Sequence, residues 1–206
     1  MIVRLLAFMT LGLIPIPGAA QSLTRDSVVY ELAPSPSSRL VVRTGKAGLL
    51  GFAGHEHLIQ AREFSGRIVY YPRQADASHV TVSIATERLE VLTPPDTAEI
   101  RKVTAAMRAE VLDVAQYPEI TLTSQSVEEA GDTLRVHAVL TMKGQTRTVP
   151  LVVRVRIGPD TLRATSTFTV RQSDYGIRPF RGGPGGTVRV ADAVSFDIDV
   201  IALRRP

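Results

Sequence analysis

Apolar and polar residues alternate with a period of two through most of the chain after residue 26. This alternation is typical of strands that bury one face. Four segments show it best, and their apolar faces are Leu134, Val136, Ala138, Leu140 and Met142; Val149, Leu151, Val153, Val155 and Ile157; Leu162, Ala164, Ser166, Phe168 and Val170; and Val194, Phe196, Ile198, Val200 and Ala202. We predict strands there and, from weaker patterns, near residues 28–33, 39–43, 66–71, 80–86 and 120–127.

Tight turns separate the predicted strands, and one segment has helical spacing instead. Turn residues at 142–145 and 158–160 indicate hairpins between consecutive strands. Across residues 96–112, Asp96 and Glu99 form a capping-box pattern. The apolar residues Ile100, Val103, Met107 and Val111 then fall on one helical face. A single helix in a chain of strands is expected to pack across the sheet or to close one end of it.

These elements predict an all-β fold with one α-helix, namely an antiparallel β-barrel of about eight strands with the helix packed at the barrel. The inward faces combine large residues with Ala and Ser, and small inward residues leave volume unfilled. We therefore predict an internal cavity that binds a ligand. The positions expected to line or underlie it are Leu134, Val136, Ala138, Leu151, Val153, Phe168, Phe196 and Ile198.

Composition excludes several classes of function. Hydrophobic residues make up 44% of the chain, which is enough for a core, and the formal net charge of +4 is spread along the sequence. Nucleic-acid binding normally needs a concentrated basic stripe, so we predict no nucleic-acid partner. The chain has no cysteine, which excludes disulfides, thiol catalysis and thiolate metal sites.

The N-terminus has the pattern of a secretory signal peptide. Arg4 precedes an apolar run of about ten residues, and small residues follow at 18–20. The run is shorter than the roughly 20 residues that span a bilayer. We predict a signal peptide at residues 1–20, a single barrel domain at 21–206, and a periplasmic or secreted protein; an uncleaved anchor is the alternative.

Four motifs then resemble those of a known family. They are Tyr117-Pro118-Glu119-Ile120-Thr121-Leu122-Thr123-Ser124, Leu140-Thr141-Met142-Lys143-Gly144-Gln145-Thr146-Arg147, Ser173-Asp174-Tyr175-Gly176-Ile177, and the long turn from Gly51-Phe52 to Phe64-Ser65-Gly66. Their order and spacing resemble the YceI-like family of exported lipid-binding proteins across most of residues 28–203. The resemblance departs at three places: the family's Arg-Asp-x-His-Leu run is absent, Val111 and Leu112 replace phenylalanines, and Tyr30 replaces a tryptophan.

The resemblance implies a lipocalin-like barrel that holds an isoprenoid-like lipid or quinone in its lumen. It implies a periplasmic carrier or storage protein and neither an enzyme nor a cofactor. For partners we expect the lipid and transient contact with a membrane, and for the oligomeric state a monomer and a homodimer both stay open.

The sharpest local feature is His55-Glu56-His57. In an extended segment the two imidazoles lie on one face, with Cα atoms roughly 6.5–7 Å apart. They are candidates for hydrogen bonds to a lipid head group. The alternative is a metal-binding protein or metal-dependent hydrolase that uses His55 and His57. Arg171, Arg178 and Arg181 flank the turn around Asp174. We predict that they are solvated, with contact to an anionic head group as the alternative.

Overall fold

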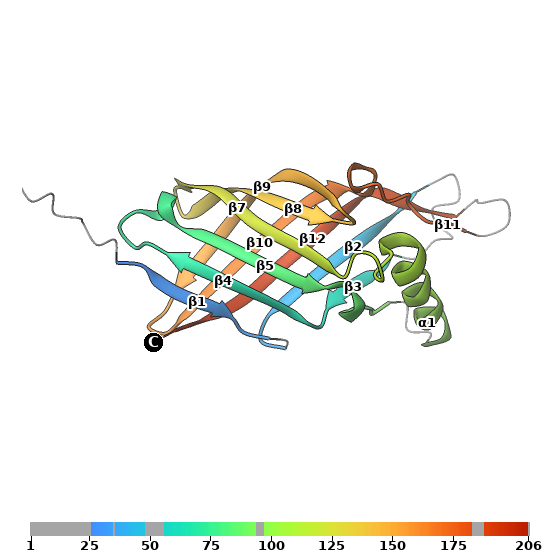
Figure 1. The fold of residues 1–206 in the computed structure, drawn as a ribbon, viewed down its shortest axis with the longest axis horizontal. Helices are drawn as coiled ribbons and strands as arrows, with labels where there is room; N and C mark the ends of the chain where they lie inside the picture. Colours follow the sequence, from blue (N-terminus) through green and yellow to red (C-terminus); the bar gives the residue numbers. More distant parts are fainter. Residues whose placement is uncertain (1–25, 35, 48–55, 94–96, 183–187, 206) are drawn as a thin grey trace, which may run out of the picture.

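The computed structural model describes residues 26–34, 36–47, 56–93, 97–182 and 188–205. The predicted signal peptide and His55 lie outside these residues. The strands are β1 Val28–Leu32, β2 Arg39–Ala47, β3 Leu58–Ala61, β4 Phe64–Tyr70, β5 His79–Ala85, β6 Leu89–Val91, β7 Glu119–Ala130, β8 Thr133–Met142, β9 Gln145–Ile157, β10 Thr161–Arg171, β11 Arg181–Gly182 and β12 Val188–Arg204. They form one antiparallel sheet, drawn in Figure 1.

The sheet closes into a barrel of eight strands, because three of those strands are each broken into two segments. β1 and β2 are two segments of one strand, because both pair with β12. β1 also pairs with β4, and β2 with β3. β3 pairs with β6 just as β4 pairs with β5, so β3–β4 and β5–β6 are two bent strands. The remaining strands follow in the order β5, β7, β8, β9, β10 and β12. The predicted all-β barrel of about eight strands is confirmed.

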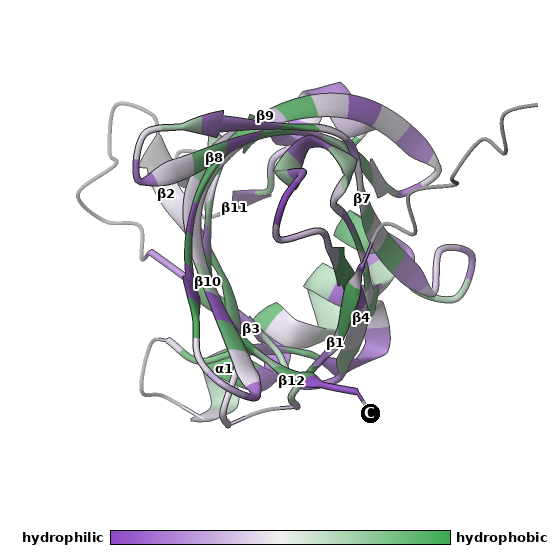
Figure 2. Cartoon of the chain, turned by 90° about the vertical axis from the view of Figure 1, so that its left-hand side faces the viewer, coloured by the Kyte–Doolittle hydropathy of each residue, from purple (hydrophilic) through white to green (hydrophobic). Residues whose placement is uncertain are grey.

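Hydrophobic and polar residues alternate along the strands in Figure 2, which looks along the barrel from the end opposite the helix. The hairpin from β8 to β9 has a two-residue turn, in which Met142 pairs with Gln145. Lys143 and Gly144 both have positive φ, of 50° and 70°, as a type I′ turn requires. A Cβ at Gly144 would also lie 2.8 Å from Cε1 of Tyr117. The local sequence therefore fixes the register of this hairpin.

The predicted helix at 96–112 is present in two parts. α1 covers Thr97–Ala106, and a π-helical segment, η4, covers Met107–Leu112. Both lie at one end of the barrel (Figure 1). Met107 is buried and Ile100, Val103 and Val111 pack against the core, as the apolar stripe predicts. Lys143 Nζ donates to the Val111 carbonyl at 2.8 Å, which ties the helix end to the β8–β9 turn.

Three strands, β3, β6 and β11, were not predicted, and β2 continues to Ala47, beyond the predicted end at residue 43. β3, β6 and β11 contain four, three and two residues. Segments this short carry too few alternating positions for a period to show. They form because each extends an existing ladder, not because of their own sequence.

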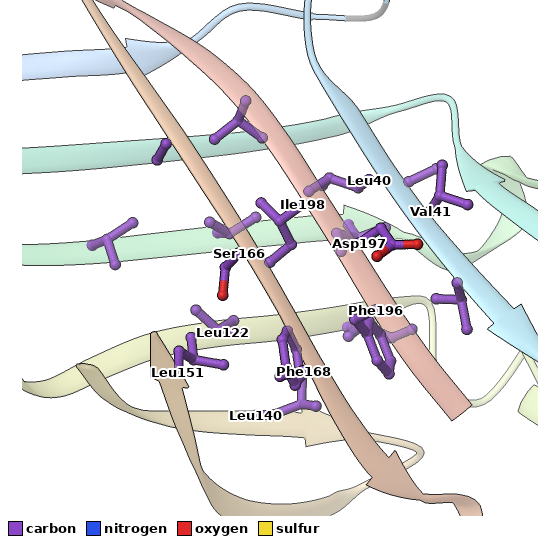
Figure 3. Close-up of a pocket in the computed structure, with 18 of the residues that line it drawn as sticks. Leu40, Val41, Leu122, Leu140, Leu151, Ser166, Phe168, Phe196, Asp197 and Ile198 are labelled. Atoms are coloured by element: carbon purple, nitrogen blue, oxygen red, sulfur yellow. The ribbon is translucent and has the colours of Figure 1, made fainter. Parts of the chain in front are cut away.

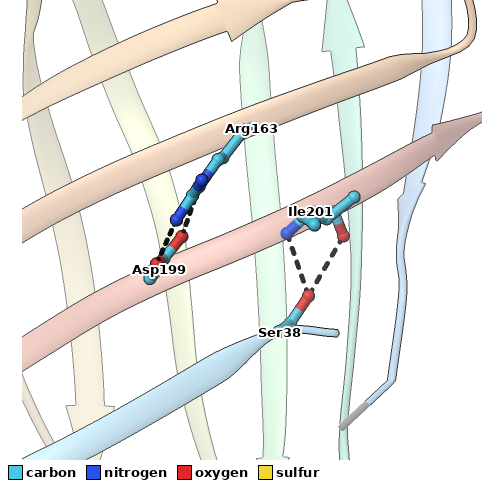
Figure 4. Close-up of polar contacts among 4 residues, drawn as sticks. All are labelled: Ser38, Arg163, Asp199 and Ile201. Carbon is cyan, nitrogen blue, oxygen red and sulfur yellow. Dashed lines mark hydrogen bonds and ion pairs between the residues drawn. The ribbon is translucent and has the colours of Figure 1, made fainter. Parts of the chain in front are cut away.

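Ser38 bridges the break between β1 and β2, at the point where both meet β12 (Figure 4). The Ser38 hydroxyl accepts a hydrogen bond from the Ile201 amide at 2.9 Å and donates to the Ile201 carbonyl at 3.1 Å. The Ser38 side chain is fully buried. One hydroxyl therefore replaces the backbone partner that β12 lacks at the break.

Replacing Ser38 with alanine should lower the free energy of unfolding by about 1–3 kcal/mol, because the buried Ile201 amide loses its acceptor. The Ile201 carbonyl keeps the Ala33 amide as a donor at 2.7 Å. Urea unfolding measures the change. Ser65→Ala is the control, since Ser65 is exposed on β4 and its hydroxyl has no hydrogen-bond partner among the described residues; it should change stability by less than about 0.5 kcal/mol. Equal effects of the two substitutions would contradict the assignment.

Ion pairs cross the strands on the outer face of the barrel. Arg163 binds both carboxylate oxygens of Asp199, at 2.8 and 2.6 Å (Figure 4). Hydrogen bonding to Arg163 lowers the pKa of Asp199, and hydrogen bonding to Arg43 lowers the pKa of Asp197. A carboxyl whose pKa falls on folding stabilises the folded state above its unfolded pKa, which is 3.8 for Asp.

The stabilisation by Asp199 should therefore be present at neutral pH and vanish as the pH falls through its lowered pKa. We expect Arg163→Gln to be less stable than the wild type at about pH 7 and to approach the wild-type value at about pH 2.5. Urea unfolding at several pH values measures this. Arg156→Gln is the control, since Arg156 is exposed on β9 and has no carboxylate partner among the described residues. Its free energy of unfolding should equal that of the wild type at every pH. A deficit in Arg163→Gln that stays constant with pH would rule out this linkage.

Candidate functional site

The barrel encloses a cavity of about 240 Å³ that reaches from the strands beside β1 to the helical end. Its wall is almost entirely aliphatic and aromatic, and Figure 3 shows side chains from several strands that converge on it. β8, β9, β10 and β12 contribute Leu134, Val136, Leu140, Met142, Leu151, Val153, Val155, Leu162, Ala164, Ser166, Phe168, Val194, Phe196, Ile198 and Val200. The wall also includes residues of β2, β4, β5 and β7, together with Met107, Val111 and Leu112 of η4.

The side chains that point into the barrel do not fill it. Leu122, Leu134, Val153 and Ile198 line the cavity, yet each keeps accessible surface instead of being fully buried. Protein interiors are normally packed as densely as organic crystals. Apolar side chains that face inward and stay partly accessible therefore mark room for a guest.

The few polar groups beside the cavity are mostly engaged within the protein. Ser166 donates its hydroxyl to the Val152 carbonyl at 2.9 Å, and Gln172 donates to the Ala191 carbonyl at 2.8 Å. Phe168 and Phe196 stack with ring centroids 4.9 Å apart. The wall thus presents an apolar, aromatic surface with little hydrogen-bonding capacity.

The two ends of the cavity differ. At the end away from the helix, Tyr30, Leu162 and Ala202 form a buried apolar cluster, with Ile68 and Tyr70 packed against it. At the other end the wall consists of η4 and the residues after β10, including Ile177. Tyr175 lies buried next to these residues; its hydroxyl has no hydrogen-bond partner in the described part of the chain, and burial raises its pKa.

Seven of the eight barrel residues predicted from the sequence line this cavity, namely Leu134, Val136, Leu151, Val153, Phe168, Phe196 and Ile198. Ala138 shares their face but is completely buried and does not contact the cavity. Leu40, Leu122 and the η4 residues were not predicted. Leu40 and Leu122 lie on β2 and β7, where apolar and polar residues alternate less cleanly. The apolar face of a helix does not show in the sequence whether it will contact a packed core or a cavity.

Among the described histidines, His57 and His79 are not brought together at the cavity. His57 precedes β3; its Nδ1 lies 2.8 Å from the Thr93 carbonyl, and its amide donates to the Thr44 hydroxyl. His79 lines the cavity at the other end, from β5. Within the described ranges, no three His, Cys, Asp or Glu residues gather in a way that suits a metal ion. For His55 and His57 a role in ligand binding stays a prediction.

Comparison with known proteins agrees with this architecture. The model of the YceI-like domain matches residues 34–202. The chain belongs to the YceI-like family. Two curated members, the YceI proteins of Salmonella arizonae and Salmonella newport, are each 31% identical over 94 residues, which is 46% of this chain and 46% of each relative. The matched segment therefore spans about half the length of these YceI proteins.

Solved YceI-like structures share the fold. BcnA of Burkholderia cenocepacia superimposes with a TM-score of 0.64 at 18% identity, over 80% of this chain and 95% of BcnA. A polyisoprenoid-binding domain from Saccharophagus degradans gives 0.60 at 15% identity, over 85% and 98%. The Campylobacter jejuni YceI protein gives 0.55 at 15% identity, over 72% and 85%.

Among the described residues of this YceI-like chain, no helix has the length and apolar character needed to cross a bilayer.

Two alanines on the inward face offer a matched test of the cavity. Ala164 lines it and Ala138 does not. Ala138→Phe should lower the free energy of unfolding by about 1–3 kcal/mol, because the new ring must enter a packed region. Ala164→Phe should cost less than this, since the ring enters unfilled space, and should weaken the binding of an apolar fluorescent probe. Urea unfolding and probe titration measure both. If Ala164→Phe were as destabilising as Ala138→Phe, the interior would be packed at both positions.

Proposed function

We propose that this YceI-like protein is an exported carrier that holds a single hydrophobic, isoprenoid-like lipid in its barrel. The observation that carries the proposal is the cavity of about 240 Å³ inside the barrel, whose wall is almost entirely apolar. Pockets of this character, largely preformed and apolar, are typical of small-molecule binding sites. The polyisoprenoid-binding domain of Saccharophagus degradans, which shares the fold, supports the choice of ligand class.

Burial of the tail supplies the binding energy. Each 100 Å² of apolar surface removed from water contributes about 2.5 kcal/mol. The wall offers few polar groups for orientation, so it selects for an unbranched or methyl-branched chain rather than for a particular functional group.

Binding rather than catalysis is the function that these groups support. Among the polar residues at the wall, Ser166 and Gln172 donate to backbone carbonyls, and Asp197 is paired with Arg43. A catalytic site needs a nucleophile or a general base within reach of a polarised substrate. The described part of the lumen offers an apolar surface instead, which suits a guest that leaves unchanged.

The protein is proposed to be exported and to take up its lipid through one end of the barrel. The segment at residues 1–20 has the charge and hydropathy of a secretory signal, which supports export to the periplasm or beyond. A carrier there would collect its lipid, an isoprenoid or an isoprenoid quinone, by transient contact with a membrane. The helical end of the barrel, where η4 contributes to the cavity wall, is the proposed entrance.

Protein purified without detergent should carry the lipid with it. Mass spectrometry of an organic extract should detect a long-chain isoprenoid compound in near-stoichiometric amount, because escape from an apolar lumen into water is slow. The same extract from Ala164→Phe should contain much less of it. A wild-type extract that repeatedly contains no apolar compound would refute the carrier function.

A further inference from the structure

An exposed basic surface lies at the helical end of the barrel, beside η4. Arg178, Arg181 and Arg189 line a groove of about 720 Å³ there, and all three are exposed. Phe180 lines the same groove and is 45% exposed. These four residues are called the basic surface below. A single exposed aromatic residue is ordinary, but an exposed aromatic residue together with cations is typical of surfaces that lie on membranes.

Two of the arginines face each other across a strand pair. Arg181 of β11 and Arg189 of β12 are cross-strand partners, which places their side chains on the same face of the sheet. The Val190 amide donates to the Phe180 carbonyl at 3.0 Å and extends this ladder. Like charges directly opposite each other destabilise a strand pair. The fold therefore holds positive charge together at this end, although the arrangement costs the free protein stability.

The arginines of the basic surface lack the acidic partners that other arginines of the barrel have. On the outer wall, Arg43 and Arg163 each bind an aspartate of β12. Arg178, Arg181 and Arg189 form no ion pair with the residues that the structure describes. Their guanidinium groups are therefore available to anions outside the chain.

The acids beside the groove do not balance these charges. Two carboxylates, those of Glu110 and Asp192, line it. Asp192 accepts hydrogen bonds from the hydroxyl and the amide of Ser173, and these bonds, with the nearby charge of Arg171, lower the pKa of Asp192. Three arginines against two acids leave the groove positive, and the exposed Arg171 adds to the surplus.

The basic surface lies beside the proposed entrance of the lumen. Val111 of η4 lines both the groove and the cavity. Figure 1 shows β11 and α1 at the same end of the barrel. A bilayer that contacts this end therefore faces the entrance directly, and the lipid has a short path between membrane and lumen.

We propose that the basic surface docks the helical end of the barrel on a bilayer that contains anionic phospholipids. This inference rests on the proposed carrier function, to which it adds the contact surface and the charge of the membrane. The partner is the bilayer and not the carried lipid, because the wall of the cavity includes none of these arginines.

The strength expected of this surface suits a carrier that must also leave the membrane. Each arginine near an anionic bilayer strengthens binding by roughly fivefold, and the attraction falls off within a Debye length. A bilayer presents many anionic groups at once, so a few exposed arginines need no matching shape in their partner. Phe180 adds apolar contact at the level of the lipid head groups. The docking is therefore reversible and sensitive to salt.

Vesicles that differ only in charge test the proposal. The binding of lipid-free protein to vesicles of phosphatidylcholine, and to vesicles of equal parts phosphatidylcholine and phosphatidylglycerol, can be measured by co-sedimentation. We expect the wild type to bind the anionic vesicles at least about tenfold more tightly at low salt, and to release them at about 0.5 M salt.

Two double variants with the same change of charge locate the contact. Arg181→Gln/Arg189→Gln should bind anionic vesicles at least about tenfold more weakly than the wild type. Arg67→Gln/Arg156→Gln should keep most of the binding, because it removes exposed arginines from β4 and β9 on the outer wall of the barrel. Equal losses in the two variants would show that net charge, and not this surface, attracts the protein, and would overturn the proposal.

The face that meets the membrane can be read directly, because the chain has no tryptophan. Phe180→Trp introduces a single reporter, whose emission should shift to shorter wavelength on anionic vesicles and be quenched by brominated lipids. Val152→Trp is the matched control, since Val152 is 60% exposed on β9. Its emission should not change. A shift at Val152→Trp without one at Phe180→Trp would place the contact on another face and overturn the proposal.

The remaining outcomes separate docking from carriage. Equal binding of the wild type to neutral and anionic vesicles, or binding to neither, would overturn the docking surface. Displacement of an apolar fluorescent probe from the lumen, measured without vesicles, tests the carrier function by itself. The probe should bind the wild type and Arg181→Gln/Arg189→Gln with the same affinity. A wild type that docks on vesicles but takes up no apolar probe or lipid would instead refute the carrier function.

A stability measurement guards against a structural role of the arginines. Lipid-free Arg181→Gln/Arg189→Gln should melt at or above the wild-type temperature, because it loses a like-charge contact. A lower melting temperature would show that the arginines support the fold, and would contradict the proposal.

Discussion

The hydrogen-bonded ladder along β12 holds the barrel closed, and the apolar cavity exists only while it does. This strand pairs with β10 along its length, with β2 over one part of the opposite edge and with β1 over the other. The break between β1 and β2 falls inside this ladder, and the buried hydroxyl of Ser38 spans it. Because a closed sheet has no free edge, its inward side chains cannot move together to fill the space between them.

An unfilled lumen carries a cost that a guest removes. In protein cores an unfilled cavity costs stability, and the cost grows with the volume of the cavity. A bound apolar tail fills the lumen and makes the contacts that its wall otherwise lacks.

Much of the fold could be predicted from the sequence, because the period of two in β8, β9, β10 and β12 determines both the strands and their inward faces. The same pattern found Leu134, Val153 and Phe168 at the cavity wall. It could not separate the completely buried Ala138 from the residues at the wall, since alternation tells inward from outward but not packed from open. The sequence named Arg178 and Arg181 among arginines that are solvated or, alternatively, meet an anionic head group, but it did not show that Arg181 and Arg189 are cross-strand partners, because β11 has only two residues.

The claim that the barrel is built around a lipid is tested most directly by a crystal structure of protein purified without detergent and never exposed to organic solvent. We expect continuous electron density along the lumen, from the wall at Leu134 to η4. A lumen occupied by the protein's own side chains, with no space for a chain of carbon atoms, would contradict the account.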